Sequence, residues 1–513
     1  MLLEVELIKK VDMFCDESAA ATVASWLNRN YEMMFLNMWG FDFDYEAAIK
    51  ENHIGSNISR GFLIDAVMSN LEKYHGIKVT TEVLNVANAI SVLKNELKKN
   101  IPVSLTVNHS YCDWSKDTDD TYLLLIGYTD EAFYCYDIHG NEADRKILLF
   151  DRLEEYIKRE TEVNYETYGI VSDEITDISL DTFINSIRES VYPNCKEMRY
   201  KMKQLSKCFK ERFNLYEEIK GHEKNYFVPV FLNITHILRA RRLTSEMLEY
   251  IYKVTNDIRA KQYSYTLDEI ASMWKVQWAT LWRLTVYNYD VKDPRYQEFM
   301  NTISEEIDKI ADKEYNFIYG VCNNTLECNQ QVVACEPHDY IIAEKNVAEI
   351  DLREYYNNQA FASSINNDEK ADLSGQGECF YFQEQENGIS VEIGGKTMRI
   401  PIDYQSNNNI CCLGQRVDFH GIRCKKLVII ICSVWKDFYE RVSINLDENK
   451  EMQIVLKVPD WYNIANNPYE VWQGNVIDFK NERIRRSLYG YIYDLDDVVI
   501  KSMVLPNDSL LHC

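Results

Sequence analysis

The sequence predicts a multidomain α+β protein with a mixed N-terminal domain, an all-helical middle domain and a C-terminal all-β sandwich. Its 513 residues exceed what a single hydrophobic core organises, so several domains are expected. From about residue 178 to 320 apolar residues recur at helical spacing with very few Gly or Pro, whereas from about 349 onward they alternate with a period of two. We therefore expect domains at 1–175, 178–320 and 349–513.

The N-terminal domain is expected to combine helices with an antiparallel hairpin. A long apolar-periodic stretch opens at Cys15 and predicts a helix there. The turn Asp130-Glu131 separates two β-rich runs, and the first run, Tyr122–Ile126, is apolar on both faces like a covered central strand. The other predicted elements are helices over Ser59–Tyr74 and Val86–Lys99 and strands over Val103–Val107, Tyr122–Gly127 and Ala132–Tyr136.

Two local patterns stand out in the helical middle domain. Thr266 and Glu269 have the spacing of a capping box, which predicts that a helix begins there. The same helix carries Trp274, Trp278 and Trp282 at intervals of four residues. Such a stripe either lines a ligand pocket or packs against neighbouring helices, and we interpret it as core.

The C-terminal domain is predicted to be a jelly-roll sandwich, because short β-rich runs alternate with Asn, Asp and Gly clusters. The run Gly394–Thr397 has the letters that end a phosphate-binding loop, but Ser390 stands where such a loop needs a glycine. We interpret Gly394-Gly395 as a hairpin turn. The predicted strands are Gly388–Ile393, Thr397–Ile402, Lys426–Cys432 and Met452–Val458.

The composition excludes several functional classes. A net charge of −25 argues against nucleic acid as a general partner. The chain opens without an apolar leader, and its longest apolar run, Leu427–Cys432, is far too short to cross a membrane, so we expect a cytoplasmic protein without a membrane partner. Fourteen scattered cysteines indicate buried thiols in a reducing compartment. The spacing of Cys322, Cys328 and Cys335 matches no common zinc pattern, and no metal is expected.

One basic stripe interrupts this acidic composition. Five basic residues recur at steps of three and four, so one helix face would carry all of them. Such a face is either a solvated surface or a docking site for an acidic partner. We name it the basic face; its residues are Lys196, Arg199, Lys203, Lys207 and Lys210.

Cys15 stands at the expected start of a helix, where free amides and the helix dipole favour a thiolate. Asp16 and Glu17 follow at once, and their negative charge opposes thiolate formation. Because the two effects are comparable in size, the sequence does not fix the pKa of this thiol. The two interpretations of Cys15 are a catalytic nucleophile and a small buried core residue.

Several blocks accompany Cys15 in a familiar order: Tyr31–Phe35 running into Trp39–Phe41, then Tyr111–Trp114, Tyr122–Tyr128 and Phe133–Asp137. With these blocks the first domain resembles the N-terminal domain family of the butirosin biosynthesis protein H, a papain-like fold related to the cysteine peptidases that trim bacteriocin leaders. The helical segment resembles the region that follows this domain in such proteins. The last segment resembles a galactose-binding-type jelly roll in Asp351–Tyr355 and Ala371–Gly377.

This resemblance implies a nucleophile at Cys15 and an orienting acid at Asp137. The position of the family's histidine holds Thr121, which cannot act as a base at neutral pH. His109 and His139 are the nearest histidines in sequence, and each is either a replacement base or a structural residue.

Strand alternation places His109 on the side of Leu105 and Val107. We assign His109 to the catalytic set with Cys15 and Asp137. Substrate contacts are expected from four residues around these positions, which are Asn108, Tyr111, Trp114 and Thr121.

The activity that the resemblance implies is acyl transfer in thiotemplated natural-product biosynthesis. An acyl group moves from the phosphopantetheine thioester of an acyl or peptidyl carrier protein to Cys15, and then to a small amine acceptor. No intrinsic cofactor is expected, because the carrier-borne thioester is a co-substrate, and the basic face would bind the acidic carrier. Peptide hydrolysis is the least favoured reaction. The alternative is a catalytically degenerate scaffold or binding protein; we favour the enzyme because Cys15 and Asp137 are both present.

Overall fold

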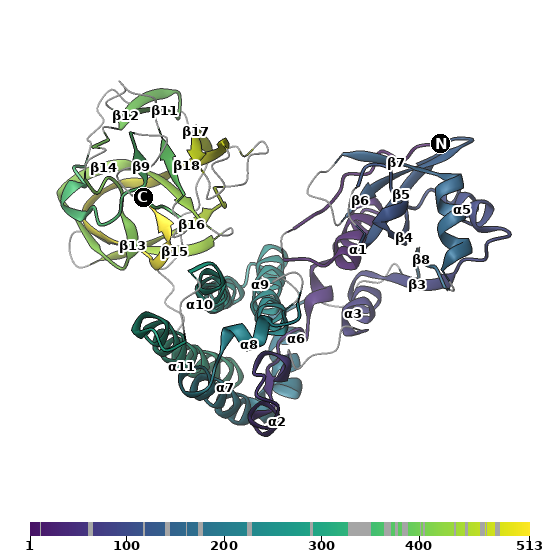
Figure 1. Ribbon diagram of the computed structural model, residues 1–513, viewed down its shortest axis with the longest axis horizontal. Coiled ribbons are helices and arrows are strands. Elements are labelled where there is room, and N and C mark those ends of the chain that lie inside the picture. The colour runs from purple at the N-terminus through teal and green to yellow at the C-terminus, as the bar shows by residue number, and fades with distance from the viewer. Residues whose placement is uncertain are drawn as a thin grey trace.

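Figure 1 shows the computed structural model of the chain, with an N-terminal α/β region, a helical middle region and a C-terminal β region. This succession confirms the predicted order of mixed, helical and all-β segments. Within the described residues, no helix is both long enough and apolar enough to cross a membrane. The structure describes all residues except 11, 60–64, 116–117, 139–143, 161, 173–177, 223–227, 288–290, 327–349, 364–370, 375–377, 382–387, 401, 404–405, 435–437, 447–449, 462–466, 468 and 478–482.

A six-stranded antiparallel sheet organises the N-terminal region. The predicted hairpin on either side of Asp130-Glu131 is present, with Leu124 paired to Tyr136. Outer strands of the sheet are polar on their exposed side, and the sequence pattern did not predict them. In order across the sheet, the strands are β3 (Ile77–Val83), β8 (Asn164–Ile170), β4 (Val103–Asn108), β5 (Asp120–Tyr128), β6 (Ala132–Asp137) and β7 (Arg145–Leu149).

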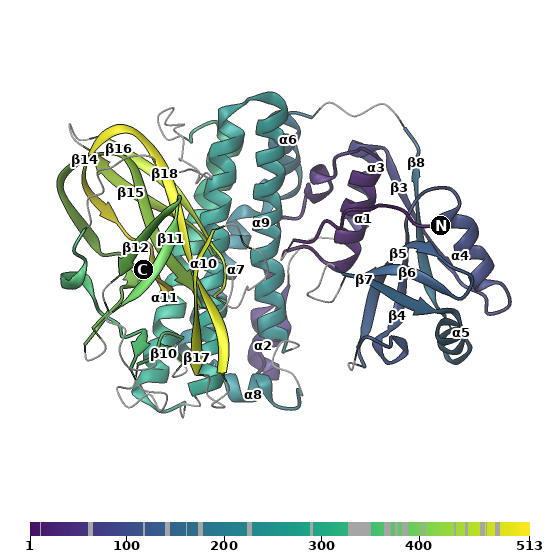
Figure 2. The ribbon, with the colours of Figure 1, turned by 90° about the horizontal axis from the view of Figure 1, so that it is seen from above.

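Helices cover both faces of this sheet, as the apolar central strand predicted. Leu124 and Ile126 of β5 join the core beneath α1 (Cys15–Trp26) and α3 (Asp65–His75). The alternate side chains of β5 join a second core beneath α4 (Ala89–Leu97) and α5 (Phe150–Arg159). Figure 2 shows α1 between the sheet and the helical region, with α4 and α5 on the outer side.

Of the predicted helix over Ser59–Tyr74, the structure describes α3 (Asp65–His75), while residues 60–64 lie outside the described residues. Ser59 instead pairs with Asp42 in a two-stranded ribbon. The small elements here are β1 (Asp42–Phe43), α2 (Tyr45–Glu51) and β2 (Ile58–Ser59).

The helical region contains two long antiparallel neighbours, α9 and α10. The capping-box prediction is wrong, because α10 begins at Ile258 and the Thr266 hydroxyl donates to Gln262 O within the helix at 3.2 Å. The tryptophan stripe is core as predicted, with Trp274 and Trp278 buried. The helices are α6 (Leu180–Ser190), α7 (Cys195–Glu211), α8 (Leu215–Ile219), α9 (Pro229–Thr255), α10 (Ile258–Tyr287) and α11 (Pro294–Asn323).

A fully buried ion pair joins the helical region to the N-terminal region. Arg241 on α9 donates to both carboxylate oxygens of Glu314 on α11, at 3.0 and 2.8 Å, and to Gly40 O at 2.8 Å. The indole N–H groups of Trp39 and Trp274 donate to the same carboxylate at 3.0 and 3.1 Å. Each charge therefore has several hydrogen-bond partners, which is the condition for burying an ion pair without a large penalty.

The C-terminal region is built around a nine-stranded sheet and packs on α10, where the Lys275 ammonium lies 4.5 Å from the Phe438 ring centroid. The predicted turn at Gly394-Gly395 joins the hairpin β11 (Ile389–Ile393) and β12 (Lys396–Ile400), and both glycines have positive φ. In order, the sheet contains β13 (Cys411–Leu413), β19 (Asn507–His512), β14 (Arg416–Ser433), β18 (Arg483–Val504), β17 (Glu470–Ile477), β10 (Cys379–Tyr381) and β9 (Phe361–Ala362), with β15 (Phe438–Leu446) and β16 (Glu451–Val458) branching from β18.

Candidate functional site

Cys15 is the first residue of α1, as the sequence predicted. The preceding residue, Phe14, has an extended backbone and no side-chain oxygen that could cap the helix. Glu17 supplies the missing cap, because its Oε2 accepts the Phe14 N–H at 2.9 Å. This local contact ties the backbone before the half-buried thiol to the first turn of α1.

The pKa of the Cys15 thiol is raised to about 11. Burial is the largest cause, and the negative charges of Asp16 and Asp137 add to it, while the Lys9 ammonium opposes it. At neutral pH the thiol is therefore protonated, and the helix N-terminus alone does not produce a thiolate. A reaction at this thiol needs a base.

Three strand termini meet at one edge of the sheet near this thiol. Because β4, β5 and β6 are antiparallel neighbours, the end of β4, the start of β5 and the end of β6 lie together. Val107 pairs with Thr121, and Leu123 pairs with Asp137. Thr121 and Asp137 therefore point to the same side of the sheet as Leu123, toward α4 and α5.

Asp137 is a buried carboxylate that accepts three side-chain hydrogen bonds. The Thr121 hydroxyl donates to Oδ1 at 2.7 Å, and the Trp114 indole donates to Oδ2 at 2.9 Å. His109 Nε2 lies 3.0 Å from Oδ2. Burial acts to raise the pKa of Asp137, but the donors from Thr121, Trp114 and His109 outweigh it and lower the pKa to about 2.

His109 follows β4 directly and begins a short 3-10 turn, His109–Tyr111, in the predicted orientation toward the side of Val107. Its backbone N–H donates to Asp119 O at 2.9 Å, which fixes the turn against the start of β5. Because ionised Asp137 can only accept, Nε2 carries the hydrogen of this pair, and in the neutral ring Nδ1 then holds the lone pair. An acid-oriented imidazole of this kind is equipped to take up a proton.

The structure separates the four residues assigned to substrate contacts into two groups. Trp114 and Thr121 contact Asp137, as described above. Asn108 instead ties the loop after β4 together, donating to Thr118 O at 2.7 Å and to Asp120 Oδ1 at 3.0 Å. The Tyr111 hydroxyl accepts from Arg159 Nη1 at 3.1 Å, and its ring packs on Tyr156. The contacts of Asn108 and Tyr111 therefore stabilise the fold next to the site.

Sequence reasoning missed two residues at this site. Lys9 acts electrostatically on both Cys15 and Asp137, and its only sequence signal was a position six residues before the cysteine. Cys112 is a second thiol next to Asp137. Burial and the charge of that carboxylate raise the pKa of Cys112 to about 12. His139 lies outside the described residues.

The basic face lies on α7 as predicted, but ion pairs within the chain occupy part of it. Arg199 and Lys203 both bind Asp312 of α11, at 2.7 and 2.9 Å. Lys207 lies 4.0 Å from Glu211, one turn along the same helix. Lys196 and Lys210, at the two ends, are exposed.

No group of metal-ligating side chains gathers in the part of the chain that the structure describes. Cys322 is buried at the end of α11, while Cys328 and Cys335 lie outside the described residues.

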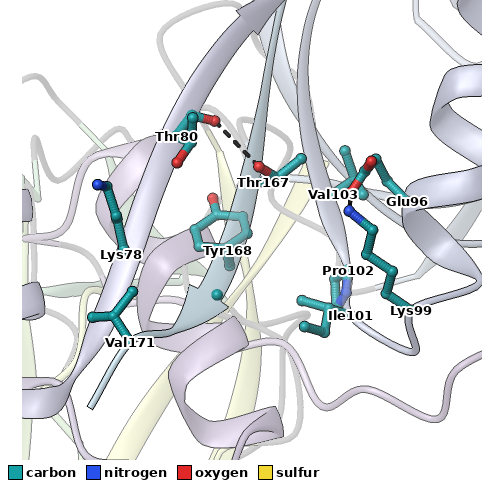
Figure 3. A pocket seen from close by; sticks show the side chains of 11 residues that line it. Lys78, Thr80, Glu96, Lys99, Ile101, Pro102, Val103, Thr167, Tyr168 and Val171 are labelled. Carbon is teal, nitrogen blue, oxygen red and sulfur yellow. Dashed lines mark hydrogen bonds and ion pairs between the residues drawn. The ribbon is translucent and has the colours of Figure 1, made fainter.

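A cavity of about 340 Å³ lies beside the outer strand β3 and its neighbour β8 (Figure 3). Lys78 and Lys99 flank it, and Lys99 pairs with Glu96 at 2.5 Å. Thr167 on β8 donates to Thr80 O at 3.5 Å across the cavity wall. Residues of the strand edge around Asp137 do not line this cavity, so it is a separate feature.

Comparison with protein-family models gave no match, and comparison with curated proteins gave none either. The reactions that the site could support are therefore inferred from its own geometry. It combines a protonated thiol at a helix start, a carboxylate that acts on that thiol electrostatically, and an imidazole oriented by the same carboxylate.

Proposed function

We propose that the protein is a thiol-dependent acyltransferase or amide-forming enzyme of natural-product biosynthesis, with a papain-like N-terminal domain of the butirosin protein H type. The single observation that carries the proposal is the His109–Asp137 pair at 3.0 Å, because Asp137 also acts electrostatically on Cys15. The pair supplies the acid-oriented base that Thr121 cannot provide at the expected position.

In the proposed reaction His109 removes the proton of Cys15, and the sulfur attacks the carbonyl carbon of a phosphopantetheine-borne thioester. The carrier thiol leaves with a proton, and a small amine then attacks the acyl-enzyme and releases Cys15 as a thiol. Because the pKa of Cys15 is about 11, the first step depends on the base. A thioester is already activated, whereas a peptide bond is not, so transfer is favoured over peptide hydrolysis.

The co-substrate in this proposal belongs to an acyl or peptidyl carrier protein in the cytoplasm, and no intrinsic cofactor is required. Carrier proteins are acidic, and the exposed ends of the basic face, Lys196 and Lys210, would contact one. The jelly-roll assignment of the β region, with a galactose-binding-like sandwich, belongs to the same proposal.

One observation favours a second function, a catalytically degenerate scaffold. The Thr121 hydroxyl already satisfies Asp137 at 2.7 Å, and the charge next to Cys15 opposes its ionisation. In a scaffold the strand edge would be a stable polar core, and its thiols would be inert.

Intact-mass measurement with small acyl pantetheine thioesters distinguishes the two functions. The acyltransferase predicts one acyl adduct on the wild-type chain, absent from Cys15→Ala and retained in Cys112→Ser, the matched thiol control. No adduct on the wild-type chain, or an adduct that persists in Cys15→Ala, would reject acyl transfer through Cys15 and favour the scaffold.

A further inference from the structure

The segment that leads to Cys15 is attached to the helical region along one side of α9. Lys10 binds Glu246 at 2.5 Å, Asp12 lies 3.9 Å from Arg242, and Glu17 pairs with Arg239. Successive residues of the segment thus contact successive turns of α9 in the opposite direction. We call residues 10 and 12–17 the thiol segment. Figure 2 shows α1 between α9 and the sheet.

Phe14, the residue directly before Cys15, is held on two sides by α9. The Arg239 guanidinium lies 3.5 Å from the centroid of the Phe14 ring, which is stacking distance. The His236 ring, one turn earlier on α9, meets the same ring edge-on with centroids 5.3 Å apart. The orientation of the backbone that enters Cys15 is therefore set by a helix from another region.

Arg239 also acts through the cap of α1. It pairs with Glu17, whose carboxylate accepts the Phe14 N–H, so one guanidinium reaches the backbone before Cys15 by two routes. Both Arg239 and Glu17 are 3% exposed. Among the described residues Arg239 Nε and Nη1 have no hydrogen-bond acceptor, and the ion pair and ring contact of this arginine are both with the thiol segment. A buried group with so few partners would cost stability if it served packing only.

We propose that Arg239 is a positioning residue for Cys15, holding the start of α1, and with it the thiol, in a fixed position against α9. The catalytic meaning of this placement rests on the proposed function, whereas the placement itself does not. The helical region is accordingly a working part of the thiol site, and loosening α9 from the thiol segment changes the chemistry of Cys15 without unfolding the chain.

Two rates measured on the full chain test this proposal. Local opening exposes a half-buried thiol to a small reagent, so Arg239→Met is expected to raise the iodoacetamide alkylation rate of Cys15 several-fold. The same displacement moves the sulfur away from its base, and acylation by a pantetheine thioester is expected to fall by about 100-fold. Arg295→Met is the control, since Arg295 pairs with Asp293 at the start of α11; both of its rates should equal those of the wild type.

Opposite changes in the two rates, with the cooperative unfolding transition retained, support positioning. A folded Arg239→Met chain with both rates unchanged would overturn the proposal. If that variant does not fold, Phe14→Leu decides, because it removes the stacked ring and keeps the ion pair; faster alkylation supports positioning and an unchanged rate rejects it. If the wild-type chain is not acylated at all, acyl transfer fails as a function, and the alkylation rates still decide the position of Cys15.

Discussion

Arg239 and Arg241 lie two residues apart on α9, and each forms a buried ion pair with a carboxylate. The two pairs differ in how many of their polar atoms are hydrogen-bonded. Arg241 and Glu314 share two direct hydrogen bonds, and two indoles and a backbone carbonyl satisfy the remaining polar atoms. Arg239 meets Glu17 and the Phe14 ring, while Nε and Nη1 have no acceptor among the described residues. Burial alone thus does not show what an ion pair does. The fully bonded Arg241–Glu314 network joins the helical region to the N-terminal region, and the incompletely bonded Arg239–Glu17 pair positions the Cys15 thiol.

The largest effect is expected from breaking the complete network. Glu314→Ala leaves the Arg241 charge buried without a counterion and should lower the free energy of unfolding by about 3–5 kcal/mol in urea titrations. The double variant Arg241→Met with Glu314→Leu removes both charges and should lose much less. Equal losses in the single and double variants would show that the network does not act as a unit.

Acid should weaken the same interface through His75, which is buried, accepts the Met33 N–H at 3.0 Å and lies beside Tyr250 of α9. Burial, with a smaller contribution from Arg29, lowers the pKa of His75 from 6.5 to about 4. As the pH falls, His75 therefore binds a proton in the unfolded chain at a higher pH than in the folded chain. The contribution of His75 is complete above pH 6.5 and should decline by about 3 kcal/mol toward pH 4.

The free energy of unfolding measured by urea titration between pH 7 and pH 4 checks the His75 prediction. His75→Gln keeps an acceptor without titrating, and its pH dependence should be shallower than that of the wild type. Parallel curves for the two proteins would exclude His75 as the source.

A smaller effect is expected at the incomplete pair. Arg239→Lys retains the charge beside Glu17 but loses the planar group that stacks on Phe14, so the unfolding free energy should fall by about 2 kcal/mol. A loss as large as that of Glu314→Ala would mean that the two pairs are structurally equivalent, against the comparison above.

Asp137 extends the comparison to a buried carboxylate that accepts from a hydroxyl and an indole and contacts an imidazole. Thr121→Val removes the 2.7 Å hydrogen bond and should raise the pKa of Asp137 by about one unit, equivalent to about 1.4 kcal/mol. The folded pKa of about 2 lies below the ordinary 3.8, so this stability is present above pH 3.8 and is lost as the pH falls toward 2. NMR titration of the carboxyl carbon measures the shift, and an unchanged pKa would exclude the hydroxyl as a contributor.

Much of the fold followed from local patterns. The start of α1, the β5–β6 hairpin and the tryptophan core all depend on residues close in sequence, and the structure has all three. The pattern failed where tertiary contacts dominate. Ile77–Val83 reads as polar because it is an outer strand, and Thr266 sits inside a helix whose packing overrides its preference for a cap.

The site was predictable only in part for the same reason. Alternation gave the side of the sheet on which His109 lies, but its contact with Asp137 depends on the register of three strands. The pKa of Cys15 depends on burial, which competing local charges do not reveal. Arg239 and Glu17 are 222 residues apart, and no local pattern relates them.

The acylation rate of Cys15 in His109→Gln tests the central claim most directly, because that variant keeps a side-chain amide near Asp137 and cannot take up a proton. Time-resolved intact mass with a pantetheine thioester should give a rate about 10²–10⁴-fold below that of the wild type. Cys112→Ser, which alters a neighbouring side chain without removing a base, should react at the wild-type rate. An unchanged rate in a folded His109→Gln chain would contradict the account, since the imidazole on Asp137 would then be structural and Cys15 would react without it.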